Sequence, residues 1–178
     1  PRMVQSSQVS NSPELLNPPR DLEGPKTHPT WVVLKDTIEQ QGQLLIFVGT
    51  RRSAESEALK LSKRVLKLLE KENPEKLKEL KLLSQTLEGR TQTAMGEKLS
   101  QCIIGGVAFH HAGLTHSQRK SIENAFKNGL LIALSATPTL AAGVNLPARR
   151  VLVRHVKRWD YGMNRPLPVM EVRQMLGR

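Results

Sequence analysis

The stretch Leu44-Leu45-Ile46-Phe47-Val48-Gly49-Thr50-Arg51-Arg52-Ser53 decides the fold class of this chain. Its first five residues form a continuous apolar run that ends at Gly49, which is typical of a strand covered on both faces. Ser53 is the predicted cap of a long helix, because small and aliphatic residues recur along one face from 54 to 68. A buried strand that leads into an amphipathic helix predicts a β-α unit.

The same alternation continues along the chain. Further strands are predicted at 107–110, 130–134 and 151–153. Further helices are predicted at 31–38, 77–87, 95–102, 115–129 and 168–175, the fourth of them opened by the capping-box sequence Thr115-His116-Ser117-Gln118. Residues 157–167 are polar and contain glycine and proline, which predicts a partly ordered loop; the alternative is that Trp159 and Tyr161 stack on a base. The fold class we expect is α/β, with a mostly parallel sheet and helices on both faces.

The first 29 residues differ from the rest of the chain. They contain six prolines and little apolar periodicity, which indicates an extended arm or linker. The predicted folded domain therefore covers residues 30–178. The total length of 178 residues suits one domain with a tail.

The charge balance favours a polyanionic partner. There are 27 Lys and Arg residues against 16 Asp and Glu residues, a net charge of +11. Such a domain releases counterions when it neutralises phosphates, although a merely solvated basic surface remains an alternative. Aromatic residues make up only 3% of the chain, so we expect contacts with nucleic-acid phosphates rather than stacked bases.

Several classes of protein are excluded by pattern. No stretch of about 18 apolar residues is present, so no membrane span is predicted. The polar start, residues 1–10, does not resemble a signal peptide. Cys102 is the one cysteine, which precludes an internal disulfide and favours a reducing intracellular compartment. No Cys/His cluster has metal-ligand spacing, so we expect no metal site.

Three segments that follow predicted strands carry side chains suited to phosphate. They are 49–53, 110–114 and 135–145, and parallel strands bring such segments to one edge of a sheet. They supply guanidinium groups, hydroxyls, glycines and helix-start N–H groups. Ordinary turns with surface arginines are the alternative. Arg149 and Arg150 leave two interpretations open: a DNA contact, or surface arginines beside a strand.

The sequence lacks a nucleotide-binding core of its own. No G-x-x-x-x-G-K-[ST] phosphate loop and no Asp-Glu dipeptide occur in it. We therefore do not expect this chain alone to hold a nucleoside triphosphate tightly.

Four segments resemble motifs of the superfamily II helicases. Residues 45–55 look like motif IV, 107–114 like motif IVa, 137–147 like motif V and 174–178 like the first half of motif VI. The sequences TLAAGVNLPA and QMLGR are most similar to those of the Hjm branch, which are archaeal helicases of the Ski-like group. The resemblance implies a RecA-like three-layer fold, and it identifies residues 30–178 as a second RecA-like domain that is incomplete at motif VI.

The resemblance also implies roles for individual residues. The residues expected to contact nucleic-acid phosphates are Thr50, Arg51, Arg52, His111, Gly113, Thr137 and Thr139. The residues expected to face the nucleotide are Gly143, Asn145 and Gln174. Arg178 is the expected catalytic arginine finger, which would stabilise charge on the transferred phosphoryl group.

The activity implied by the resemblance belongs to a larger protein. It is ATP-dependent, 3′ to 5′ translocation on single-stranded DNA, with unwinding of forks and branched junctions in repair and recombination, in a cytoplasmic, nucleoid-associated enzyme. ATP and Mg²⁺ would be held mainly by a first RecA-like domain, so none is expected in this fragment, which is expected to be inactive alone. The partners would be single-stranded and forked DNA and the other helicase domains of the same chain. Two alternatives remain: a Ski-like RNA helicase domain, and a stand-alone nucleic-acid-binding module without catalysis.

Overall fold

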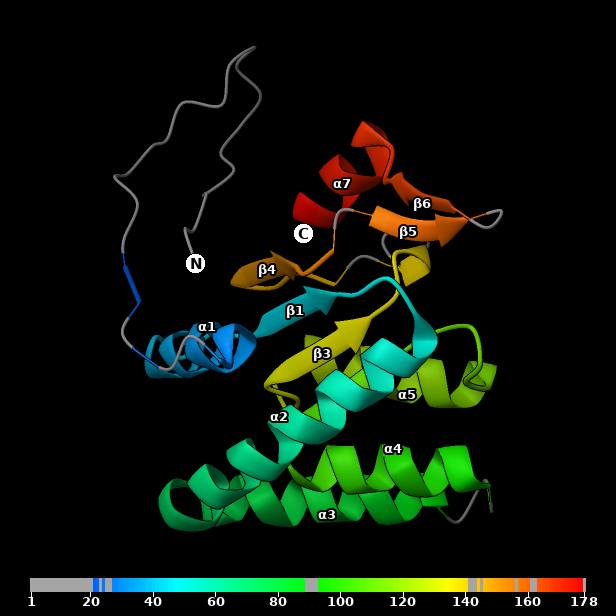
Figure 1. Ribbon diagram of the computed structural model, residues 1–178. Helices are drawn as coiled ribbons and strands as arrows, with labels where there is room; N and C mark the ends of the chain where they lie inside the picture. Colours follow the sequence, from blue (N-terminus) through cyan, green and yellow to red (C-terminus); the bar gives the residue numbers. More distant parts are fainter. Residues whose placement is uncertain are drawn as a thin grey trace.

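The computed structural model describes residues 21–22, 24, 27–88, 93–140, 144, 146–155, 157–160 and 163–177. A four-stranded parallel sheet lies at its centre (Figure 1), in the order β2-β3-β1-β4. The strands are β1 (Leu44–Phe47), β2 (Val107–His110), β3 (Ala133–Ala136) and β4 (Arg150–Val153). The register pairs Leu44 with Ala133 and Arg150, so the strands begin at one level and all four carboxyl ends meet at one edge.

The apolar runs form strands because both sides of the sheet are covered. Every residue of β1, β2 and β3 is buried. The largest fully buried side chains include Phe47 on β1, Phe109 on β2 and Phe126 on a covering helix. These observations confirm the predicted α/β class, and the arrangement is that of a RecA-like domain.

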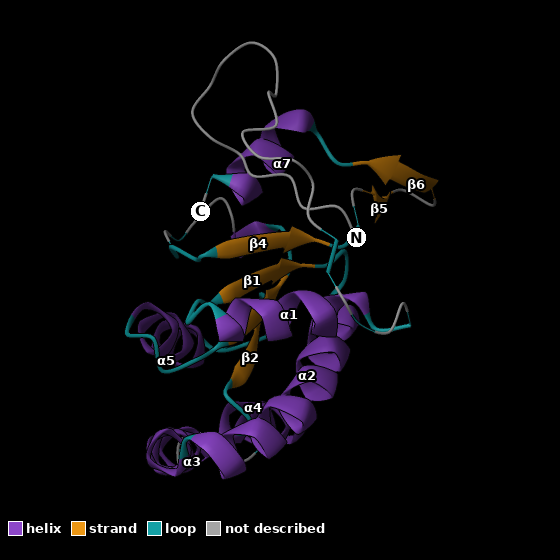
Figure 2. Ribbon diagram, turned by 90° about the vertical axis from the view of Figure 1, so that its left-hand side faces the viewer, coloured by secondary structure: helices purple, strands orange, loops and turns teal. Residues whose placement is uncertain are grey.

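The covering helices lie on opposite sides of the sheet. Figure 2 shows α2 (Arg51–Glu72) and α4 (Ala94–Ile104) on one side and α5 (His116–Lys127) on the other. Next to α4 lies α3 (Pro74–Glu88), joined to it by mutual hydrogen bonds between Ser84 and Ser100. The first helix, α1 (Pro29–Glu39), reaches the amino end of β4 through bonds from Arg150.

Two helix starts differ in how well the sequence predicts them. The capping box of α5 is confirmed: the Thr115 hydroxyl accepts the Gln118 N–H, and the Gln118 side chain accepts the Thr115 N–H. The predicted cap of α2, Ser53, is wrong. Thr50 is the cap, and its Oγ1 accepts the Ser53 N–H at 3.1 Å. Either hydroxyl suits the position, and the extended backbone of Thr50 decides between them.

The third strand lies further along the chain than its apolar run predicts. Residues 130–134 were the expected strand, whereas β3 is Ala133–Ala136. Leu131 and Ile132 belong to the connection from α5: the Leu131 carbonyl accepts a hydrogen bond from Gln43, and the Ile132 N–H bonds to Gly106. The connection is buried, so its apolar residues resemble a strand in the sequence.

The predicted loop at 157–167 is wrong for most of its length. Residues Lys157–Asp160 (β5) and Met163–Pro166 (β6) form a two-stranded antiparallel sheet. It is followed by α7 (Val169–Leu176), which packs against β4 and buries Met175. Polar composition alone does not distinguish a hairpin exposed to solvent from a loop.

Cys102 is buried in α4, and desolvation raises the pKa of its thiol to about 12. Within the described ranges, no helix has the length and apolar character needed to cross a bilayer. The described residues also contain no group of three acidic, His or Cys side chains placed to hold a metal ion. The predicted arm, residues 1–29, lies almost entirely outside the part of the chain that the structure describes.

Candidate functional site

The three segments singled out in the sequence lie side by side at the carboxyl edge of the sheet. Strand β3 lies between β1 and β2, so the segment after β3 lies between the other two. Two backbone hydrogen bonds extend this pairing past the strand ends: Val48 N–H to the Ala136 carbonyl at 3.0 Å, and Thr137 N–H to the His110 carbonyl at 3.2 Å. The arrowheads of β1 and β3 in Figure 1 point to this edge.

The segment after β1 presents two cationic side chains. Thr50 uses its hydroxyl within the segment, where it donates to Ser53 Oγ at 2.8 Å and caps α2. Arg51 and Arg52 follow in the first turn of the helix, and both are exposed. In the described part of the chain neither has a carboxylate within ion-pair distance. Their charge adds to the partial positive charge at the start of α2.

The segment after β2 is held in place by a buried histidine. The side chain of His111 is 1% exposed and stacks on Phe109, with ring centroids 5.3 Å apart. Its Nδ1 accepts the Gly113 N–H at 3.1 Å, so the proton of the neutral ring lies on Nε2. Nε2 faces Glu55 Oε1 at 3.4 Å.

The charge state of His111 follows from its surroundings. Burial lowers the pKa of His111 below its ordinary value of 6.5, against the opposing attraction of the Glu55 carboxylate, and nearby Arg51 lowers it further. At neutral pH the ring is therefore neutral and serves as a hydrogen-bond acceptor inside the turn. As the structure places it, the His111 side chain is not available to a phosphate in solvent.

Gly113 is exposed, and its missing side chain brings the first two segments together. A Cβ at this position would lie 3.0 Å from the His111 ring and 3.9 Å from Arg51 Nη1. The first of these distances is tighter than an ordinary contact, so a larger residue would push against the His111 ring, and glycine favours this close approach. The same geometry places the Arg51 guanidinium beside the turn.

The segment after β3 contributes two hydroxyl groups at the start of a helical turn. Thr137 is buried, and its Oγ1 lies 3.0 Å from Oγ1 of Thr139. Thr139 is exposed, and the backbone at Thr139 and Leu140 is helical. Gly143 and Asn145, which the sequence assigned to nucleotide, lie outside the described residues, and so does Arg178.

Gln174, the remaining residue assigned to nucleotide, is exposed on α7. That helix packs against β4, the edge strand of the sheet. The three segments therefore follow β1, β2 and β3, whereas α7 packs against β4.

Two acidic residues that the sequence analysis missed fix α2 against the edge. Glu57 is buried and its Oε2 accepts from Arg154 Nη1 at 2.5 Å, just past the end of β4. Glu55 bonds to Lys98 on α4 at 3.1 Å and faces His111. Only their position on the inner side of the predicted α2 helix could have indicated them, because both partners are distant in sequence.

A second buried pair joins the sheet to α5. His110 Nε2 lies 2.9 Å from Glu123 Oε1. Burial lowers the pKa of His110, which the hydrogen bond and charge of Glu123 oppose. The pair fixes the start of the turn at His111, since His110 ends β2.

Arg149 and Arg150 lie at the other edge. Arg150 pairs with Asp36 and donates to Thr37 Oγ1 at 3.1 Å, and Arg149 donates to Gln40 Oε1 at 3.2 Å. All three acceptors belong to α1 or its end, at the amino ends of the strands. Of the two open interpretations, the structure favours arginines that flank a strand.

At the carboxyl edge, therefore, two exposed guanidinium groups, an exposed glycine turn and a threonine hydroxyl lie beside the starts of α2 and α5. Helix starts and guanidinium groups bind anions. The described residues of these three segments include no Trp, Tyr, Asn or Gln side chain, and Trp and Tyr are common platforms for stacked bases. The surface is suited to a phosphate backbone.

Comparison with known proteins points in the same direction. A family model described as helicase conserved C-terminal domain matches residues 30–178. The chain is 45% identical over 148 residues to the ATP-dependent DNA helicase Hel308 of Methanocella arvoryzae, which covers 82% of this chain and 20% of that protein. It is 46% identical over 144 residues to the protein of the same name from Pyrococcus horikoshii, covering 80% and 19% respectively. The chain thus spans about a fifth of the length of these relatives.

Proposed function

Because the chain belongs to the family of helicase conserved C-terminal domains, we propose that it is the second RecA-like domain of an ATP-dependent DNA helicase. The observation that carries this proposal is that three strand-end segments meet at one edge of the sheet. There the exposed guanidinium groups of Arg51 and Arg52, which no described carboxylate pairs, lie beside two helix starts. A motor that moves along DNA of any sequence needs such contacts with phosphates.

The proposed contacts divide into direct and positioning roles. Arg51, Arg52 and Thr139 are exposed and contact the phosphates, and Gly113 allows the strand to approach the backbone. Thr50 sets the start of α2, and Thr137 bonds to Thr139. His111, buried behind Gly113, holds the turn in shape, which replaces the direct contact that the resemblance implied.

The nucleotide belongs mainly to another domain in this proposal. The chain has no phosphate loop, so ATP and Mg²⁺ would be held by a first RecA-like domain of the same protein. Gly143, Asn145 and Gln174 would face the nucleotide across the interface. Arg178 would place its guanidinium against the transferred phosphoryl group as an arginine finger. Because ATP and Mg²⁺ would be held by the other domain, the isolated chain would be inactive as an ATPase.

The proposed activity of the whole protein is 3′ to 5′ translocation on single-stranded DNA, with unwinding of forked and branched DNA in repair and recombination. Its partners would be such DNA and the other helicase domains of the same chain, near the nucleoid. Support for DNA comes from the relatives, which are named as DNA helicases. Phosphate contacts alone also suit RNA.

The experiment uses the full-length protein and a labelled fork with a 3′ single-stranded tail. We expect ATP-dependent unwinding, and ATPase activity stimulated more by single-stranded DNA than by RNA of the same sequence. With Arg178→Ala, we expect ATPase turnover to fall by about 10³-fold or more while DNA affinity is retained. Wild-type turnover in Arg178→Ala would remove the arginine-finger assignment. Stimulation by RNA alone would change the substrate class, and the absence of any stimulation would refute the motor.

A further inference from the structure

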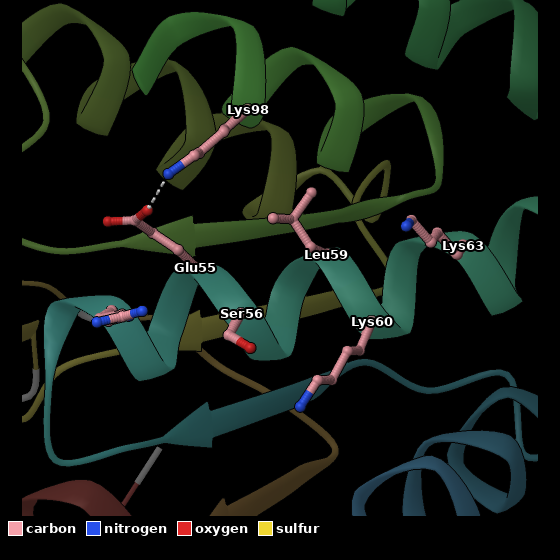
Figure 3. A pocket seen from close by; sticks show the side chains of 7 residues that line it. Glu55, Ser56, Leu59, Lys60, Lys63 and Lys98 are labelled. Carbon is pink, nitrogen blue, oxygen red and sulfur yellow. Dashed lines mark hydrogen bonds and ion pairs between the residues drawn. The ribbon is translucent and has the colours of Figure 1, made fainter. Parts of the chain in front are cut away.

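A groove of about 260 Å³ runs along α2 on the side that faces α4 (Figure 3). Four of its seven lining residues are basic. The lining consists of Arg52, Glu55, Ser56, Leu59, Lys60, Lys63 and Lys98. Six of these belong to α2 and recur every three or four residues, so they form one face of that helix. Lys98 comes from α4 on the opposite wall.

The positive charge of the groove is not neutralised from within. Glu55 is its one acidic residue, and it is already engaged by Lys98 at 3.1 Å and by His111 at 3.4 Å. Glu57, the next carboxylate on α2, is buried and pairs with Arg154. Among the described residues no carboxylate lies within ion-pair distance of the cationic groups of Arg52, Lys60 or Lys63.

The groove is continuous with the carboxyl edge of the sheet. Arg52 lines the groove and also belongs to the segment after β1 that presents phosphate-binding groups. Glu55 connects the groove wall to the His111 turn. From Arg52 to Lys63 the helix rises about 16 Å, which is the length of a few consecutive nucleotides of a single strand.

The walls of the groove lack a platform on which bases could stack. Its remaining residues are one small hydroxyl side chain, Ser56, and one aliphatic side chain, Leu59. No aromatic residue lines it, so bases have no platform on which to stack. The chemistry of the groove matches a chain of phosphodiesters.

We propose that this groove holds the backbone of the single DNA strand where that strand leaves the three-loop edge. Arg52, Lys60 and Lys63 then contact successive phosphates, and Lys98 of α4, paired with Glu55, forms the opposite wall. The inference rests on the proposed function for the identity of the polyanion. It goes beyond the helicase motifs, because Lys60, Lys63 and Lys98 belong to none of the segments that carry the resemblance.

The test compares two double variants of the full-length protein. Lys60→Glu with Lys63→Glu reverses the charge of the groove. Lys81→Glu with Lys127→Glu makes the same change on exposed lysines of α3 and α5 that neither line the groove nor follow a strand. All four side chains are exposed, so both variants should fold. Affinity is measured for labelled oligothymidylates of about 5 and about 15 nucleotides, a range that spans common single-strand site sizes.

We expect the groove variant to bind the short strand like the wild type and to lose affinity for the long strand by about 25-fold or more at 0.1 M salt, as two lost phosphate contacts require. The control should follow the wild type at both lengths. If the groove variant matches the control at both lengths while the wild type binds DNA, the groove proposal fails and the proposed function stands. If the wild type binds neither strand, both fail.

Discussion

Replacing Arg51 and Arg52 with glutamine should weaken binding of single-stranded DNA in a way that depends on salt. Both side chains are exposed at the start of α2, and neither is paired with a carboxylate in the described part of the chain. Each is therefore free to release counterions from a phosphate. Glutamine keeps much of the side-chain length and helix propensity, so the change removes charge with little effect on α2.

The size of the effect follows from the number of contacts. A phosphate contact on a single strand contributes about 0.7 to the slope of log Kobs against log salt, so two lost contacts reduce the slope by about 1.4. If the variant and the wild type bind equally at 1 M salt, the variant should bind about 25-fold more weakly than the wild type at 0.1 M salt. This ratio corresponds to about 1.9 kcal/mol. The loss should be the same for different base sequences, because phosphates carry no sequence information.

The assay is a fluorescence-anisotropy titration of the full-length protein with labelled oligothymidylate at several salt concentrations. The control replaces Lys81 and Lys127 with glutamine, which removes the same charge elsewhere on the domain. An unchanged slope in the Arg51 and Arg52 variant would refute the phosphate contacts. Equal slopes in the variant and the control would show that only net charge matters.

Three further predictions concern the framework behind the interface. Arg154→Met should lower the free energy of unfolding by about 1–3 kcal/mol, because it leaves the buried Glu57 carboxylate without its partner. Urea denaturation measures this change, and an unchanged midpoint would contradict the prediction. The lowered pKa values of His110 and His111 mean that the unfolded chain binds protons more tightly. The contribution of the two neutral histidines to the free energy of unfolding is thus complete above pH 6.5 and is lost as the pH falls towards their lower pKa values in the folded protein. Urea denaturation between pH 8 and 5 should show this decline. A free energy of unfolding that rises on acidification would be inconsistent with it. Cys102, buried with a pKa of about 12, should react with a thiol reagent at pH 8 only after unfolding, and fast labelling of the native protein would disprove its burial.

The elements that the sequence predicts well are those whose signals are local. Strand β2 was predicted with its observed bounds, and the capping box at Thr115 and Gln118 forms as expected, because four neighbouring residues determine it. Strand β3 was misplaced because Leu131 and Ile132 are buried by tertiary contacts in a connection rather than in the sheet. The β5–β6 hairpin has no apolar alternation that would have distinguished it from a loop.

For the interface, the sequence predicts which segments meet but not how each side chain is used. Parallel topology is enough to bring 49–53, 110–114 and 137–140 to one edge. The burial of His111 behind Gly113 and its contact with Glu55 depend on residues on separate elements. The pairing of Glu57 with Arg154 joins residues 97 positions apart, which no pattern within a helix indicates.

The most direct measurement of the central claim is a structure of the full-length protein bound to a single DNA strand and a non-hydrolysable ATP analogue. We predict that consecutive phosphates lie within hydrogen-bond distance of Arg51, Arg52 and the helical turn at Thr139, with Gly113 against the backbone and the bases directed away from this domain. A strand that crosses another surface of the domain and leaves those residues in solvent would contradict the account.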